Sequence, residues 1–178
     1  MTTRSVTTDQ ETASADLPSL IKRLAMAMER DLDAGERAQL RRLDVKAPDQ
    51  PAFWKLMAAW IAPERPLSPP EETRWAIILS NMARMWPSCH QPGRSVGRVL
   101  AETNYQEIRL MRLLRTHGPT FADAVRRMCG FLASRAEPVD WAELAALILT
   151  SNPDKAETLR RKIARVYYQT IQRKEKKP

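Results

Sequence analysis

Three arginines recur at intervals of three residues along the segment 107–115, at Arg109, Arg112 and Arg115. In a helix, which turns by ~100° per residue, they would lie on one side, opposite the leucines of the same segment. Like charges at this spacing repel one another, and binding of a polyanion would relieve that repulsion. Because the planar guanidinium group pairs with phosphate through two hydrogen bonds, the spacing predicts a phosphate-binding face. The alternative is the solvated polar face of an ordinary surface helix.

Other basic groups share the second half of the chain with these arginines. Residues 1–90 carry 12 Lys and Arg against 12 Asp and Glu, whereas residues 91–178 carry 17 against 9, which accounts for the whole net charge of +8. Clustered cations of this kind attract and hold nucleic acids. Contacts to phosphate position a nucleic acid but do not read its sequence, so we expect binding without sequence preference. Further candidates for phosphate contact in this half are Arg126, Arg127, Lys155, Arg160 and Arg161.

The remaining reactive residues form no constellation for catalysis or metal binding. Cys89 and His90 are adjacent, but Cys129 and His117 are the only other cysteine and histidine. A zinc site needs three or four ligands. The sequence also has no glycine-rich phosphate loop and no spaced carboxylates of the kind that a two-metal nuclease uses. We therefore predict no enzyme activity, no metal and no cofactor.

The sequence also bears on the compartment. Two cysteines form no disulfide framework, which suits a reducing cytoplasm. The first residues, MTTRSVTTDQETASAD, are polar and lack the apolar region of a signal peptide. Because no run approaches the ~20 apolar residues that span a bilayer, we predict a cytoplasmic protein without a membrane partner.

Helices are the elements expected to position these groups. Apolar residues recur at helical spacing, alternating runs of Val, Ile and Thr are absent, and the 13 prolines fall mostly between the periodic segments. We predict an all-α fold of about eight or nine helices, the first beginning at Leu17. Ser68 and Glu71 have the spacing of a capping box at a helix start. Asn152 before Pro153 has the signature of another helix start.

These helices are predicted to form two small bundles that divide at the loop 86–94, where the charge balance changes. Together the bundles would make an elongated basic protein. The predicted parts are a disordered tail over 1–16, an N-terminal helical bundle over 17–90, a C-terminal basic bundle over 91–172 and a basic tail over 173–178.

The aromatic residues have two possible uses. We expect Trp54, Trp60, Trp75 and Trp86 in the core of the first bundle. The adjacent rings at 167 and 168, both tyrosine, are expected to pack in the core, with base stacking by one of them as the alternative.

Six segments follow one another in an order that resembles a known family. They are AQLRRL (38–43), PAFWKLM (51–57), SVGRVLA (95–101), EIRLMRLLR (107–115), VRRMCGFL (125–132) and AEPVDWAELA (136–145). Over residues 17–172 this set, with its S-x-G-R segment and its E-P-x-D-W turn, resembles the CasB family, the small subunit of the type I-E CRISPR Cascade surveillance complex. The resemblance implies a non-catalytic, all-helical protein of two small bundles that acts in antiviral defence.

The resemblance also implies partners. Two copies would lie along the inner curve of the complex, with the large subunit and the crRNA-bound backbone subunits as neighbours. Their basic surfaces would hold the heteroduplex of crRNA and target DNA and the displaced DNA strand of the R-loop. Cutting would belong to a separately recruited helicase-nuclease.

The residues that the resemblance assigns to nucleic-acid contact are all basic. Arg42, with Arg41 beside it, matches a position in the first bundle, and Arg98 belongs to the S-x-G-R segment. The others lie on the central, following and last helices, at Arg109, Arg112, Arg115, Arg126, Arg127, Lys155, Arg160 and Arg161.

The sequence leaves three other functions open. A free-standing helical DNA-binding regulator would prefer one duplex site over random DNA. A structural adaptor would use its arginines to meet acidic protein surfaces, and a nuclease would cleave nucleic acid in the presence of metal. Little sequence preference, retention of crRNA and absence of cleavage would distinguish a Cascade subunit from all three.

Overall fold

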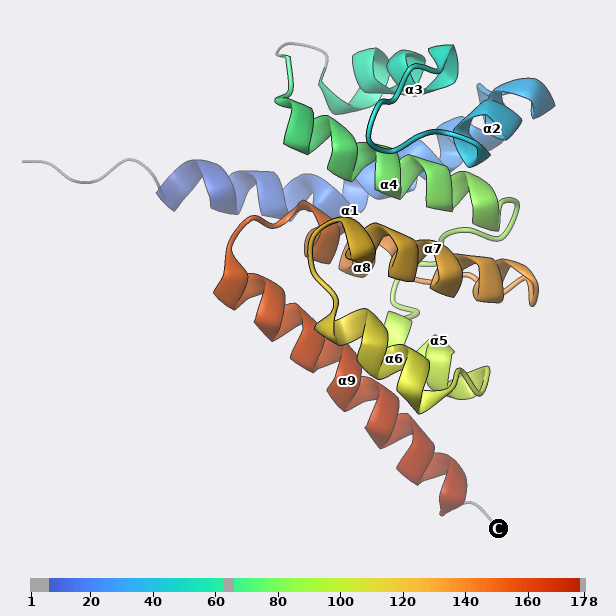
Figure 1. The fold of residues 1–178 in the computed structure, drawn as a ribbon, viewed down its shortest axis with the longest axis vertical. Coiled ribbons are helices and arrows are strands. Elements are labelled where there is room, and N and C mark those ends of the chain that lie inside the picture. Colours follow the sequence, from blue (N-terminus) through green and yellow to red (C-terminus); the bar gives the residue numbers. More distant parts are fainter. Residues whose placement is uncertain (1–6, 63–65, 177–178) are drawn as a thin grey trace, which may run out of the picture.

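The chain folds into helices over the part that the structure describes. The computed structural model describes residues 7–62 and 66–176, the first ten of them as backbone only. Its elements are α1 (Thr7–Arg30), α2 (Ala34–Arg41), α3 (Pro51–Leu56), the π-helical turn η1 (Met57–Ile61), α4 (Pro69–Met85), α5 (Val96–Glu102), α6 (Glu107–Arg115), α7 (Pro119–Ala133), α8 (Trp141–Leu149) and α9 (Pro153–Glu175). These nine α-helices, with no strand element among the described residues, confirm the predicted all-α fold (Figure 1). Within these ranges, no helix combines the length and the apolar character that a bilayer-spanning segment requires.

Both ends of the chain are more helical than the sequence predicts. Helix α1 begins at Thr7 rather than at Leu17, so residues 7–16 of the expected disordered tail are helical. Helix α9 continues to Glu175, into the predicted basic tail. Residues 1–6 and 177–178 lie outside the described part of the chain.

Polar cap residues set the starts of two long helices. The Ser68 N–H donates to Glu71 Oε2 at 2.8 Å and closes the predicted capping box before α4. At the start of α9, Asn152 Oδ1 accepts from the backbone N–H groups of Asp154 and Lys155 at 2.9 and 3.1 Å. Such side-chain acceptors satisfy donors that have no partner inside the helix. The caps therefore fix where these helices begin.

One hydrophobic core runs through both halves of the chain. It is continuous from Ile21 of α1 to Tyr167 of α9. Helix α4 is buried along most of its length and packs against α2, α7 and α8, while α1 packs against α8 (Figure 1). Because α4 and α7 come from the two predicted bundles, the bundles share this core. The division of the chain into two domains at residues 86–94 stays a prediction.

The tryptophans occupy more varied places than the sequence predicts. Trp75 is buried, but Trp54 is 44% exposed, and Trp60 and Trp86 are only partly buried. The expectation of a core position is wrong for Trp54. Phe53 takes the buried position of α3, and the Trp54 ring packs edge-on beside it, so α3 has only one of its two aromatic rings inside the core.

The loop 86–94 is tied to the segment that precedes α8. The Gln91 N–H donates to Val139 O at 3.0 Å, and the Trp141 N–H donates to His90 Nδ1 at 3.1 Å. Arg94 also forms an ion pair with Glu137. These contacts close the loop onto the start of α8 and fix the connection between the two predicted bundles.

Acidification is expected to weaken this connection through His90. The pKa of His90 is lowered, mainly by burial and in small part by Lys22. The nearby Asp140 carboxylate opposes this effect. His90 Nδ1 must be unprotonated to accept from Trp141. The unfolded chain, with an ordinary histidine pKa of about 6.5, therefore binds the proton more readily than the folded chain. This contribution to stability is complete above about pH 6.5 and is lost as the pH falls below it, by at most about 1.4 kcal/mol per pH unit.

Urea unfolding at about pH 7.5 and about pH 5.5 measures this loss. The matched control is His90→Asn, which keeps an acceptor near the place of Nδ1 but does not titrate in this range. The variant is expected to lose less stability than the wild-type chain between the two pH values. An equal loss in both proteins would contradict the role of His90.

Candidate nucleic-acid interface

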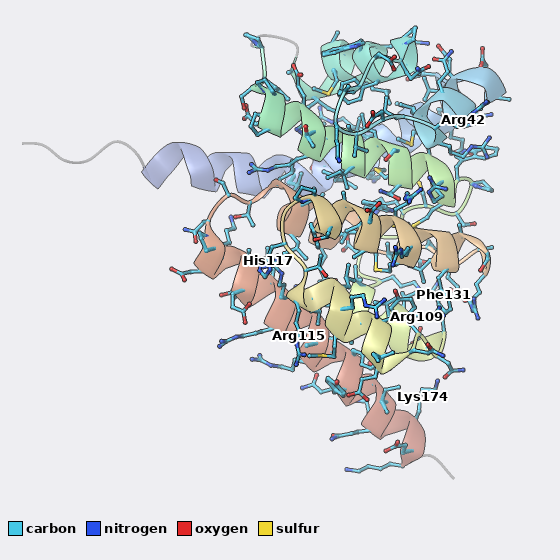
Figure 2. The ribbon with its side chains drawn as sticks, in the orientation of Figure 1. Arg42, Arg109, Arg115, His117, Phe131 and Lys174 are labelled. Carbon is cyan, nitrogen blue, oxygen red and sulfur yellow. The ribbon has the colours of Figure 1, made fainter. Side chains whose placement is uncertain are left out.

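Helix α6 separates its leucines from its arginines, as the spacing predicts. All of its leucines are buried, whereas Arg109, Arg112 and Arg115 are exposed. Figure 2 shows Arg109 near one end of α6 and Arg115 near the other. Among the described residues, no carboxylate forms an ion pair with any of the three guanidinium groups. Their charges are therefore available to an external anion.

A cavity of about 550 Å³ between α6 and α7 brings Arg109, Arg112 and Arg127 together. We name it the arginine groove. Tyr105 also lines it; burial raises the pKa of the Tyr105 phenol, and the three arginines oppose this rise. All three cations therefore act on the same side chain of the groove. Asp123 is the one acidic side chain among the described residues that line the groove, so its lining is strongly basic.

A second, larger cavity of about 890 Å³ lies where the two predicted bundles meet. We name it the junction groove; α4, α7 and the connection from α8 to α9 contribute to its walls. Three of the predicted residues line it, namely Arg41, Arg126 and Arg160. Thr120 and Asp123 of α7 line both cavities, so the two grooves adjoin along this helix.

The junction groove also contains basic residues that sequence reasoning missed. They are Lys46, Arg74 and Arg84. Arg74 Nη1 donates to Leu149 O at 3.2 Å, and Arg84 Nη2 donates to Arg41 O at 3.1 Å. The net charge of residues 1–90 gives no sign of these three cations, because this half contains as many acidic as basic residues. The one local signal is Arg84, a lone cation in the mostly apolar segment 75–85.

Five predicted residues line neither groove: Arg42, Arg98, Arg115, Lys155 and Arg161. Two of them are already paired within their own helices. Arg98 Nε lies 2.7 Å from Glu102 Oε1, and Arg161 Nε lies 2.9 Å from Glu157 Oε1. Arg42 donates to a main-chain carbonyl of α2, and Figure 2 shows it apart from the arginines of α6. The other six predicted residues are gathered in the two adjoining grooves.

The adjacent tyrosines of α9 separate into one buried and one exposed ring. The Tyr167 O–H donates to Tyr105 O at 2.6 Å, and the side chain lies in the core. Tyr168 is 37% exposed, and its O–H donates to Glu107 Oε1 at 2.7 Å. The expected core packing therefore holds for Tyr167 and is wrong for Tyr168.

The two cysteines of the described chain are buried. No group of three or more His, Cys, Asp or Glu side chains in this part of the chain could hold a metal ion. Burial raises the pKa of the Cys89 thiol to about 11 and raises that of Cys129 as well. Both thiols are therefore protonated at neutral pH and are poor nucleophiles. What the two grooves offer a ligand is positive charge beside apolar surface.

The family model of the CRISPR-associated protein Cse2 matches residues 36–168, a range that contains all the predicted contact residues. A comparison with curated protein sequences gave no match.

Several solved structures share the fold. A Cse2-family CRISPR-associated protein from Thermus thermophilus is 20% identical, with a TM-score of 0.67 over 88% of this chain and 97% of that chain. CasB from Thermobifida fusca is 19% identical, with a TM-score of 0.66 over 87% and 97%. A chain in the crystal structure of E. coli Cascade bound to a PAM-containing double-stranded DNA target is 23% identical, with a TM-score of 0.61 over 85% and 96%. Together with the family match, they confirm the resemblance to CasB that the six ordered segments indicate. The chain belongs to the Cse2 family of CRISPR-associated proteins.

Proposed function

We propose that this chain is a non-catalytic subunit of a CRISPR Cascade complex and holds nucleic acid through arginine–phosphate contacts. The observation that carries the proposal is the arginine groove, in which Arg109, Arg112 and Arg127 converge without an ion-pair partner among the described residues. Unpaired like charges repel one another, and a bound polyanion removes that cost. Family membership and the shared fold with a chain of a DNA-bound Cascade complex support the same function.

The energetics of R-loop formation explain what such a surface does. The free energy of the DNA duplex is close to that of the heteroduplex of crRNA and DNA that replaces it. Protein contacts to the backbone can therefore decide the direction of the exchange. A cationic groove that binds the displaced strand opposes re-pairing of the DNA, and one that binds the heteroduplex stabilises the product. Because the contacts go to phosphate, the effect does not depend on the target sequence.

The proposed partners are crRNA, target DNA including its displaced strand, the backbone and large subunits of Cascade, and a second copy of the chain, all in the cytoplasm. The six predicted residues that line the grooves are proposed as the principal nucleic-acid contacts. The five that line neither groove are proposed as weaker contacts because they lie outside the grooves, and Arg98 and Arg161 are in addition paired with glutamates. Among the groove residues, Arg126 is paired with Asp123 at 3.4 Å.

The purified chain is expected to bind single-stranded DNA with strong salt dependence and no sequence preference. The logarithm of the affinity falls by ~0.7 per neutralised phosphate for each tenfold rise in salt. Three phosphates held in the arginine groove therefore contribute a slope of about −2. Fluorescence anisotropy of labelled strands of unrelated sequence, titrated at several salt concentrations, measures both properties.

The same preparation separates the rival functions. A strong preference for one duplex sequence would indicate a regulator, metal-dependent cleavage would indicate a nuclease, and failure to bind any nucleic acid would indicate an adaptor. Each of these results contradicts the proposal. In cells, nuclease-sensitive co-purification of crRNA and the large assembly with the tagged chain would support it.

A further inference from the structure

The junction groove is larger than the arginine groove, and more of its wall is apolar. Ile77 of α4, Phe121 of α7 and Ile148 of α8 line it together with a basic rim of exposed side chains that includes Arg41 and Arg126; Asp44 and Asp123 also line it. Arginines that only pair with phosphates need no apolar wall beside them. A ligand that matches the whole groove must therefore combine an anionic part with a flat or apolar part.

We propose that the junction groove binds one unpaired nucleotide of single-stranded DNA, with its base against the apolar wall and its flanking phosphates on the basic rim. This inference rests on the proposed function and extends it from phosphate contact to base contact. The cavity of about 890 Å³ lies within the size range of pockets that enclose small ligands. Deoxyribose suits an apolar wall better than ribose, because it brings no 2′-hydroxyl to be desolvated.

Phe121 and Arg160 form the stacking surface. Both line the groove, and the Arg160 guanidinium carbon lies 5.7 Å from the centre of the Phe121 ring. Phe121 is only partly buried, so part of its side chain is accessible. Aromatic rings and guanidinium planes are the two side-chain surfaces on which unpaired bases stack.

The groove-lining residues also have unused hydrogen-bonding capacity. Asn81, only 3% exposed, leaves Oδ1 without a partner among the described residues, although its Nδ2 donates to Ile77 O at 2.8 Å. Arg84 Nε and Arg160 Nε are buried donors that also have no partner there. One edge of a nucleobase carries both donors and acceptors, so it can satisfy groups of both kinds.

The test compares single-stranded DNA with a strand of the same length whose bases are replaced by abasic tetrahydrofuran units. Both strands carry the same phosphates. The wild-type chain is expected to bind the base-bearing strand about tenfold more tightly, because one stacked base contributes on this order. F121L is expected to remove this difference, so that the variant binds the base-bearing and the abasic strand with equal affinity. F121Y, which keeps the ring, is expected to preserve the difference.

Two further measurements guard against a folding artefact. Thermal melting shows whether F121L folds, and photocrosslinking of the wild-type chain to a strand containing 5-iodouracil is expected to mark the peptide that contains Phe121. Equal affinity of the wild-type chain for the two strands would overturn the base pocket and leave the phosphate-binding function standing. Tighter binding of RNA of the same sequence would overturn the assignment to DNA. Failure to bind either strand would overturn the proposed function as well.

Discussion

Replacement of Arg109, Arg112 and Arg127 together by alanine is expected to lower the affinity for single-stranded DNA about 100-fold near physiological salt. These arginines line one groove and have no ion-pair partner among the described residues, so each is free to contact a phosphate. The salt dependence should become shallower by about 2 in the log–log slope, since each phosphate contact on a single strand contributes ~0.7. In a reconstituted Cascade complex, the same variant should release target DNA faster after R-loop formation. Anisotropy titrations and dissociation rates measure the two effects.

The matched control removes the same number of charges from outside the grooves. Arg42, Arg98 and Arg161 are exposed, and the last two are paired with Glu102 and Glu157. Their joint replacement by alanine is expected to weaken binding far less, because they lie outside the grooves and because Arg98 and Arg161 must first give up a carboxylate partner. Equal losses in the two triple variants, both checked by thermal melting, would mean that net charge rather than the groove governs binding.

Arg115 illustrates which feature of the site cannot be predicted from the sequence. The three-residue spacing groups it with Arg109 and Arg112, and all three are exposed on α6 as predicted. The arginine groove, however, takes its third cation from α7, at Arg127. Helical periodicity predicts which residues share a face of one helix. It cannot predict which neighbouring helix packs beside that face, because this depends on how distant side chains fit together.

The junction groove could not be predicted from the sequence for the same reason. Its lining comes from segments as far apart as 41–46 and 147–160, and its basic residues in the first half are balanced in the charge count by acids elsewhere.

Local signals were more informative about the fold. The capping box of Ser68 and the cap at Asn152 act over a few residues, and both appear at the predicted helix starts. The segment before Leu17 has no apolar periodicity, so the start of α1 at Thr7 could not be predicted from the sequence.

Gly97 is the residue of the S-x-G-R segment whose replacement is expected to be most damaging to the fold. It lies where α5 packs against α9, and a Cβ added there would be 2.3 Å from Ile163 O and 3.0 Å from Tyr167 N. Both obstacles belong to the main chain, so a side-chain rotation cannot relieve the clash. Overpacking of this kind costs about 3 kcal/mol, and the better helix propensity of alanine returns only about 1 kcal/mol. Gly97→Ala is therefore expected to lower the free energy of unfolding by about 2 kcal/mol and the melting temperature by roughly 4–8 °C.

The same substitution is expected to disturb the arginine groove, because α9 supports it. Tyr167, next to the clash, donates from its hydroxyl to Tyr105 O, and Tyr105 lines the groove. A lower affinity for single-stranded DNA should therefore accompany the lower melting temperature. Gly130→Ala is the matched control: an added Cβ meets nothing within 4 Å, so alanine should raise stability by about 0.5–1 kcal/mol. A Gly97→Ala variant that melts at the wild-type temperature would contradict this account.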